Sequence, residues 1–139
     1  MGQKVCPTGF RIGTTENWRS RWYNGKDYAE QLENDITIRN FVTKRLANAA
    51  VSRVDIERAG EKIKVVVYTA RPGIIIGKKG SEIEGIKKEL RAIANGVVDL
   101  DVVEVKRPEL NANLVAQSVA EQLEGRVAFR SAMRKAVKS

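Results

Sequence analysis

The sequence predicts an α+β fold in which a three-stranded sheet carries helices on one face and a helical segment follows. Three segments within residues 51–105 alternate between apolar and polar residues, which is typical of strands. Apolar residues at three- and four-residue spacing, typical of one-sided helices, occur before, between and after these segments. The apolar fraction of 42% is sufficient for a folded core. We therefore expect one folded domain, or two small ones, within the 139 residues.

The first half of the chain predicts an arm, a helical region and a hairpin. Residues 1–26 are rich in Gly and Arg and show little periodicity, which indicates an extended arm. Residues 27–50 carry an apolar stripe at helical spacing, and a break into two helices at Asn34-Asp35 stays open. Residues 51–58 and 62–69 alternate and are joined by a short connector, which predicts a β-hairpin.

A short helix and a glycine turn are expected after the hairpin. Pro72 suits the first turn of a helix, because it lacks the N–H group that would be unpaired there. This helix is expected to hold residues 73–76 and to end at Gly77. Ser81 can cap the next helix, with Glu84 as its capping-box partner. The remaining elements that the periodicity predicts are a longer helix, a third strand and two further helices: residues 82–94, 97–105, 111–124 and 126–138.

The excess of positive charge lies at the two ends of the chain. The formal net charge is +8 and the pI is about 9.8, which suggests a polyanionic partner. Residues 1–23 have a net charge of +3 and residues 126–139 a net charge of +5, whereas residues 24–125 hold 16 basic and 16 acidic residues. The ends are therefore expected to be contact surfaces that flank a neutral scaffold.

The segment around the Gly77–Gly80 turn, Gly-Lys-Lys-Gly, is the strongest functional signal in the sequence. Its glycines let the backbone come close to another molecule, and its lysines indicate that this molecule is negative. The N-terminus of the next helix adds partial positive charge. We expect the turn to hold phosphates while an apolar groove beside it takes bases. The residues expected in this site are Arg71, Ile75, Ile76, Gly77, Lys78, Lys79, Gly80 and Ile83.

The sequence of the turn also allows other interpretations. A phosphate loop of the NTPase kind needs four residues between its glycines, followed by Lys and then Ser or Thr. Three residues separate Gly73 from Gly77, and Lys79 stands where the hydroxyl should be, so nucleotide hydrolysis is rejected. An ordinary linker with solvated lysines stays open as an alternative. For Arg71, pairing with a nearby acid is the alternative to contact with a nucleic-acid backbone.

The last segment predicts a helix with one basic edge. Basic residues spaced by four form a single positive ridge on a helix. Such a helix can line a channel for a nucleic-acid strand, and a solvated surface helix is the alternative. The residues of this basic helix are Arg126, Arg130, Arg134 and Lys138, with Lys135 alongside.

The N-terminal arm interleaves aromatic and basic residues. Such residues can stack on unpaired bases and hold phosphates. The alternative is that Trp18 and Trp22, which are four residues apart, pack the arm onto the core. The arm residues expected to contact RNA are Lys4, Arg11, Trp18, Arg19, Arg21 and Trp22.

The composition argues against a catalytic, metal or membrane role. The sequence has no histidine and a single cysteine, Cys6, which leaves no metal pair and no disulfide framework. A lone cysteine fits a reducing compartment. The longest apolar run is far shorter than the roughly 20 residues that span a bilayer. We therefore expect no enzymatic activity, no cofactor, no metal and no membrane partner.

Two sets of motifs resemble a known family. The order of elements and the pattern Ile-Ile-Gly-Lys-Lys-Gly-x-x-Ile, which ends at Ile83, resemble a type II KH domain. The opening Met-Gly-Gln-Lys-Val, the segments Gly9–Gly13 and Thr69–Gly80, and Arg-Pro-Glu-Leu at 107–110 resemble the bacterial-type family of small ribosomal subunit protein three. The resemblance covers the whole chain.

This resemblance implies a structural constituent of the small ribosomal subunit head in the cytoplasm. Such a protein binds small-subunit rRNA, contacts neighbouring head proteins and helps to form the entrance for mRNA. The family's mRNA-contacting cluster falls on Arg130, Arg134 and Lys135, and Ser131 stands where the family often has a second arginine. A free-standing KH protein that acts in RNA regulation or ribosome assembly is the alternative.

The resemblance also implies a division of the chain. Residues 1–26 form the arm, residues 27–108 the KH RNA-binding domain, and residues 109–139 the helical start of a C-terminal domain. Family members continue beyond this point with a second domain that has its own sheet. We therefore expect a truncated C-terminal domain in which apolar helix residues are partly exposed.

Overall fold

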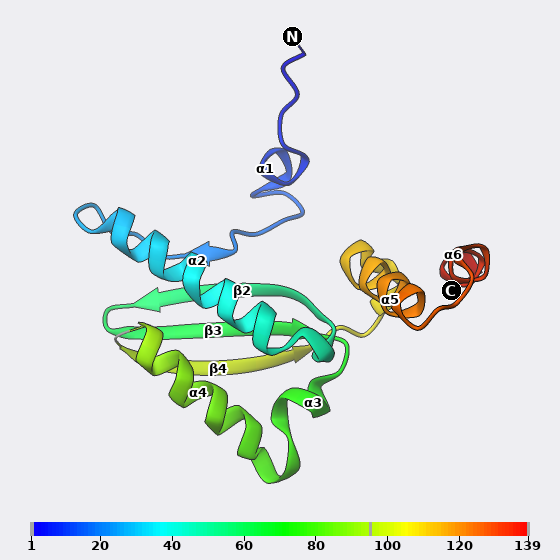
Figure 1. Ribbon diagram of the computed structural model, residues 1–139. Helices are drawn as coiled ribbons and strands as arrows, with labels where there is room; N and C mark the ends of the chain where they lie inside the picture. Colours follow the sequence, from blue (N-terminus) through cyan, green and yellow to red (C-terminus); the bar gives the residue numbers. More distant parts are fainter. Residues whose placement is uncertain (1, 95, 139) are drawn as a thin grey trace.

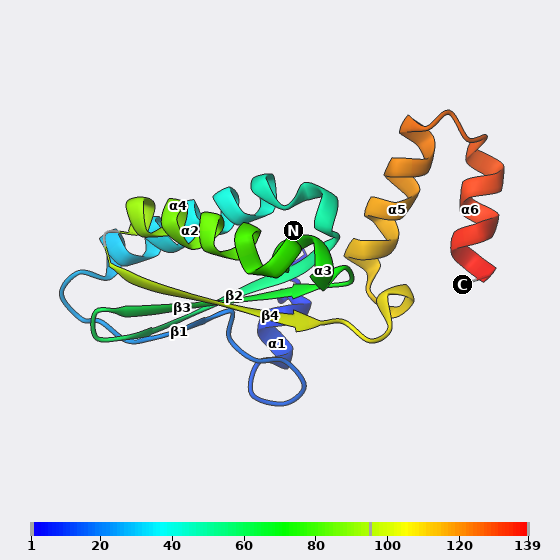
Figure 2. The same ribbon diagram turned by 90° about the horizontal axis from the view of Figure 1, so that it is seen from below.

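The computed structural model describes residues 2–94 and 96–138, and only the backbone of Lys79. A four-stranded sheet is covered on one face by helices α2 and α4, while α5 and α6 stand apart at one end (Figures 1 and 2). The expected α+β class is confirmed. The elements in chain order are α1 (Pro7–Arg11), β1 (Ser20–Arg21), α2 (Tyr28–Arg45), a 3-10 turn (Ala47–Ala49), β2 (Val51–Ala59), β3 (Lys62–Thr69), α3 (Pro72–Ile76), a 3-10 turn (Lys78–Gly80), α4 (Ser81–Ala94), β4 (Val97–Glu104), a 3-10 turn (Pro108–Leu110), α5 (Ala112–Glu124) and α6 (Phe129–Lys138).

The sheet has the strand order β1-β2-β3-β4. Strands β2 and β3 form the antiparallel hairpin that the sequence predicts, and β4 pairs with β3 in parallel after α4 has crossed over. Strand β1 is an addition to the three predicted strands: Ser20 and Arg21 pair in parallel with Ile56 and Glu57. A two-residue strand carries no periodicity that could reveal it. The arm therefore contains a short helix and a strand, and it is tied to the domain.

The hydrophobic core lies between the sheet and the two helices that cover it. Helix α2 is continuous, because Asn34 and Asp35 direct their side chains to partners on other elements instead of competing for their own backbone. Burying one aliphatic side chain contributes about 1.5–3 kcal/mol, so this interface holds the two layers together. Core side chains include Ile38, Val42, Ile56, Val65, Val67, Ile86, Leu90 and Val98.

Two helix starts differ from the expectation. Ser81 is the first residue of α4, with φ −64° and ψ −39°, because the 3-10 turn leads directly into the helix. It does not have the non-helical backbone of the cap that the capping box requires. Helix α6 begins at Phe129, and Arg126 lies in the preceding turn with φ 60°.

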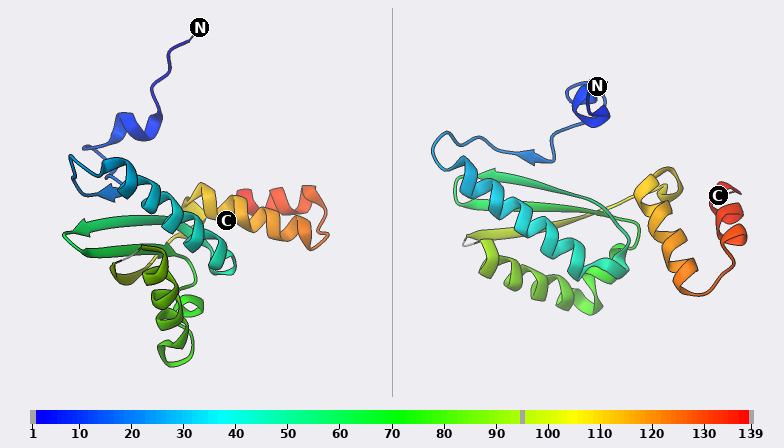
Figure 3. Two further views of the ribbon diagram at one scale, coloured as in Figure 1. Left: turned by 60° about the vertical axis from the view of Figure 1, so that its left-hand side comes forward. Right: turned by 45° about the horizontal axis from the view of Figure 1, so that its top comes forward.

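Helices α5 and α6 form a hairpin that lies away from the two layers (Figure 3). Ala132 of α6 is buried, whereas Phe129 and Met133 are 70% and 54% exposed. Leu114 of α5 is buried, although the sequence analysis expected partial exposure of the apolar residues in this part of the chain. Leu123 of α5 is 46% exposed. Part of the expected apolar surface is therefore present, on both helices.

Candidate nucleic-acid interface

The glycine turn joins α3 to α4, and its shape depends on both glycines. Gly77 has φ 69° and ψ −174°, and Gly80 has φ 80°, which are conformations that other residues rarely adopt. A Cβ on Gly77 would lie 2.6 Å from Cγ and 2.8 Å from Cβ of Glu82. The close approach at Gly77 is therefore made to the first turn of α4, and it brings the lysines of the turn next to the N-terminus of this helix.

The charges around the turn are mixed. Lys78 is exposed, whereas the side chain of Lys79 lies outside the described part of the chain. Helix α4 has Glu82 and Glu84 in its first turn. The guanidinium group of Arg45, at the end of α2, lies 3.8 Å from a carboxylate oxygen of Glu82. Arg45 thus reduces the negative charge next to the lysines, a role for which the sequence contains no local signal.

The apolar residues beside the turn divide between the core and the surface. Ile75 is fully buried in the core, so the expectation that it lines a surface groove is wrong. Successive residues of a helix point about 100° apart, so one turn of helix can bury only one of three consecutive isoleucines. Ile76 is 44% exposed as expected, and Ile74, which the sequence analysis did not select, is 47% exposed. Ile83 is half-buried against the core.

Arg71 connects the turn region to α5. Its guanidinium group lies 3.8 Å from a carboxylate oxygen of Glu121, and both side chains are about half exposed. For Arg71 the structure thus shows the alternative interpretation, in which it pairs with a nearby acid. An exposed ion pair of this kind contributes only about 0–1 kcal/mol. Arg71 can exchange Glu121 for a phosphate at little cost.

The basic side of α6 is shorter than the sequence predicts. Arg130, Arg134 and Lys138 are exposed on the helix at four-residue spacing and form the expected ridge. Arg126 is also exposed, but it precedes the helix and does not extend the ridge, which corrects that expectation. Lys135 is exposed beside the ridge and also lines the cavity that faces Arg71.

The arm residues expected to contact RNA fall into two groups. Lys4, Arg11, Trp18 and Arg19 are exposed, and Trp18 is 63% exposed. Arg21 is also exposed, but it pairs with Glu57 at 2.8 Å. Trp22 is half-buried, and its indole N–H donates to a carboxylate oxygen of Asp35 at 2.8 Å. For Trp22 the structure thus shows the alternative interpretation, in which this residue packs the arm onto the domain.

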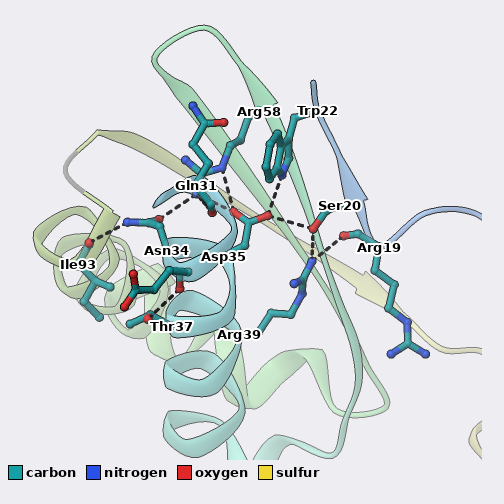
Figure 4. Close-up of polar contacts among 11 residues, drawn as sticks. Arg19, Ser20, Trp22, Gln31, Asn34, Asp35, Thr37, Arg39, Arg58 and Ile93 are labelled. Atoms are coloured by element: carbon teal, nitrogen blue, oxygen red, sulfur yellow. Dashed lines mark hydrogen bonds and ion pairs between the residues drawn. The ribbon is translucent and has the colours of Figure 1, made fainter. Parts of the chain in front are cut away.

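The arm is anchored by the buried carboxylate of Asp35 (Figure 4). Besides Trp22, it accepts hydrogen bonds from the Ser20 hydroxyl at 2.9 Å and from the Arg58 guanidinium group at 2.6 and 2.9 Å. Arg39 donates to the Ser20 hydroxyl and to the Arg19 carbonyl oxygen. The network holds β1 against the domain, and Arg19 and Arg21 therefore project from a backbone that is tied to the sheet.

The predicted contacts of the arm do not include this network, although the sequence contains one signal for it. Arg58 has the same strand parity as Val54 and Ile56, and it therefore lies on the core face of β2. A charged group on that face needs a partner, since burying an unpaired charge is very costly. An acid on the helix that covers β2 could have been sought on this basis.

Other kinds of site find little support in the described residues. Within residues 2–94 and 96–138, no group of three or more His, Cys, Asp and Glu side chains could hold a metal ion. Within the same ranges, no helix is long and apolar enough to cross a bilayer.

The folded domain of the chain matches a known protein family. The family model described as KH domain matches residues 37–110, just over half of the chain. The chain therefore belongs to the KH domain family.

The chain is also similar, over its whole length, to individual proteins. It is 55% identical over 139 residues to the small ribosomal subunit protein uS3 of Geobacter sulfurreducens, and 53% identical over 139 residues to that of Magnetococcus marinus. It is 51% identical over 136 residues to the protein of the same name from Lactobacillus helveticus. The chain spans 66% of the length of the first two relatives and 61% of the third. The resemblance to this ribosomal protein family is confirmed.

Proposed function

We propose that the chain is a non-enzymatic structural constituent of the small ribosomal subunit in the cytoplasm, where it binds small-subunit rRNA and neighbouring proteins of the subunit head. The observation that carries this proposal is the 51–55% identity, over nearly the whole chain, to proteins named small ribosomal subunit protein uS3. A free-standing KH protein would need only the KH domain. The similarity also includes the arm and the α5–α6 hairpin, which favours the ribosomal role.

The KH turn supplies the contact to the RNA backbone. Its glycines keep the chain close to α4, so that the exposed Lys78 and the helix N-terminus point at the same phosphates. Ile74 and Ile76 offer exposed apolar surface on the neighbouring α3 for the bases. Phosphate contacts position a protein on RNA without reading sequence. The turn thus acts as an anchor for one stretch of rRNA.

The basic side of α6 supplies a second surface, which we assign to mRNA at the entrance of the subunit. Arg130, Arg134 and Lys138 form an exposed ridge, and no acid lies within residues 126–139. A uniformly basic edge attracts a strand through its phosphates and lets it slide, because the contacts are independent of sequence. Because the two surfaces are separate, the protein can stay anchored to rRNA while the mRNA strand moves.

The phosphate anchor can be tested by changing both lysines of the turn. Lys78→Asp with Lys79→Asp should weaken binding to an rRNA head fragment for every sequence tested, because phosphate contacts are lost. Two lost contacts should lower the slope of log K against log salt by about 1.4–1.8. Filter binding over a salt series measures both quantities.

A matched control has the same change in charge elsewhere. Lys26→Asp with Lys62→Asp alters two exposed lysines, one just before α2 and one at the start of β3. The starts of α2 and β3 lie at the end of the sheet that is opposite the turn (Figure 1). This control should keep the slope close to that of the natural chain. An unchanged slope in the variant of the turn, or an equal loss in the control, would show that the turn is not the phosphate anchor.

A further inference from the structure

The ladder between β2 and β3 contains an irregularity, a β-bulge, at Ser52. Val51 pairs with Thr69 and Arg53 pairs with Tyr68, so Ser52 is an extra residue on β2. An extra residue of this kind is left out of the ladder, and its backbone and side chain become available to other partners. The irregularity lies at the end of the sheet next to the α5–α6 hairpin (Figures 1 and 3).

Side-chain amides from the start of α5 use these free groups. Asn111 donates to the Ser52 hydroxyl at 2.6 Å, and Asn113 donates to the Ser52 carbonyl oxygen at 3.2 Å. Gln117 donates to the Val51 carbonyl oxygen at 3.4 Å. Asn113 and Gln117 are four residues apart and lie on one face of the helix. Two turns of α5 are therefore held against one irregular point of the sheet edge.

Apolar packing of the described residues contributes little to the direction of the hairpin. In α5, which the structure describes throughout, the buried residue is Leu114, and this residue does not belong to the main core. A cavity of about 330 Å³ separates this part of the hairpin from the KH domain, with Arg71 and Lys135 among its lining residues. The Arg71–Glu121 pair across this space is half exposed and weak. An apolar interface thus does not decide the direction of α5.

We propose that the irregularity at Ser52 is a socket that sets the direction in which the α5–α6 hairpin leaves the KH domain. Ser52, Asn113 and Gln117 are positioning residues, since they hold the helix but do not present charge to a ligand. Their loss leaves both helices folded and frees the angle between α5 and the sheet. If α6 contacts mRNA as proposed above, the socket also sets the distance between the basic ridge and the KH turn.

The angle can be measured on the protein alone. Spin labels at Lys88→Cys on α4 and Ser131→Cys on α6, in a Cys6→Ser background, report the distance between the domain and the hairpin, because both labelled sites are exposed. The variant S52A/N113A/Q117A removes the socket bonds and keeps the Asn111 side chain, which caps α5 through the N–H groups of residues 113 and 114. Pulsed EPR should show one narrow distance distribution for the parent and one about twice as wide for the variant.

Controls separate direction from folding. S118A/Q122A removes hydrogen bonds that α5 makes within itself and should keep the narrow distribution. Helix content from circular dichroism should be equal in all variants. If the triple variant loses helix, the distance distribution of N113A/Q117A tests the socket instead, because alanine favours helix. An unchanged distribution, or equal broadening in the control, overturns the socket. Binding of rRNA by the turn is not involved in this measurement, so the socket and the proposed function can fail separately.

Discussion

Gly77→Ala should lower the free energy of unfolding by about 2–6 kcal/mol, a value that follows from two local costs. A non-glycine residue at φ 69° and ψ −174° costs about 1–3 kcal/mol. The added Cβ would lie 2.8 Å from Cβ of Glu82, and overpacking of this kind costs about another 1–3 kcal/mol. Rotation of the Glu82 side chain cannot relieve the contact with its own Cβ, so the first turn of α4 has to move.

Gly73→Ala is a matched control on the preceding helix. Among the described residues, no atom outside its chain neighbours and its own helix backbone lies within 4 Å of a Cβ built on Gly73. Alanine favours a helix over glycine by up to about 1 kcal/mol. Gly73→Ala should therefore be neutral or stabilising. Urea denaturation followed by circular dichroism measures the difference between the two variants.

The same substitution should also weaken RNA binding. Movement of the first turn of α4 displaces Lys78 from the helix N-terminus, so the affinity for an rRNA fragment should fall in Gly77→Ala and stay unchanged in Gly73→Ala. If both variants unfold at the same urea concentration, the backbone of the turn does not require glycine at position 77 and the reasoning is refuted.

Three further outcomes can be measured. Asp35→Ala leaves the largely buried Arg58 side chain without its carboxylate and should lower the free energy of unfolding by about 3–5 kcal/mol in urea; a loss below about 1 kcal/mol would contradict this. Burial raises the pKa of Asp55 above its usual 3.8, so the folded state binds the proton more tightly and stability falls as the pH rises through the raised pKa. Asp55→Asn should therefore unfold at a higher temperature than the natural chain at neutral pH, and this gain in stability should disappear below roughly pH 4. A gain in stability that is independent of pH would contradict a raised pKa of Asp55. Arg130→Ala with Arg134→Ala should keep rRNA binding and slow translation through structured mRNA, and a parallel loss of both would contradict two separate surfaces.

Local pattern was enough to predict the elements that line the KH turn. The hairpin, the short helix that begins at Pro72 and the longer helix that ends at Ala94 follow from alternation, helical spacing and glycine positions. These signals act between near neighbours in the chain, and tertiary contacts did not override them. The position of the glycine turn between two helices was predictable for the same reason.

The roles of single residues at the site were less predictable. Three adjacent isoleucines look equivalent in sequence, but the rotation of α3 on the core buries Ile75 and exposes Ile74 and Ile76. Periodicity alone placed Arg126 on a helix, whereas the turn after α5 gives it a left-handed backbone. Rotation and helix ends are set by neighbouring elements, which one-dimensional spacing does not contain.

By itself, the sequence determined the α+β class, the glycine turn with its lysines, and the concentration of positive charge at the ends, since each depends on composition or on spacing within a few residues. Only the tertiary structure decided that the arm adds strand β1 through the buried Asp35, that Arg71 faces Glu121, and that α5 is seated on the irregularity at Ser52. These contacts join residues that are 13 to 66 positions apart. Their geometry exists only after the sheet and its helices have packed, because burial and hydrogen-bond geometry then select one partner among many.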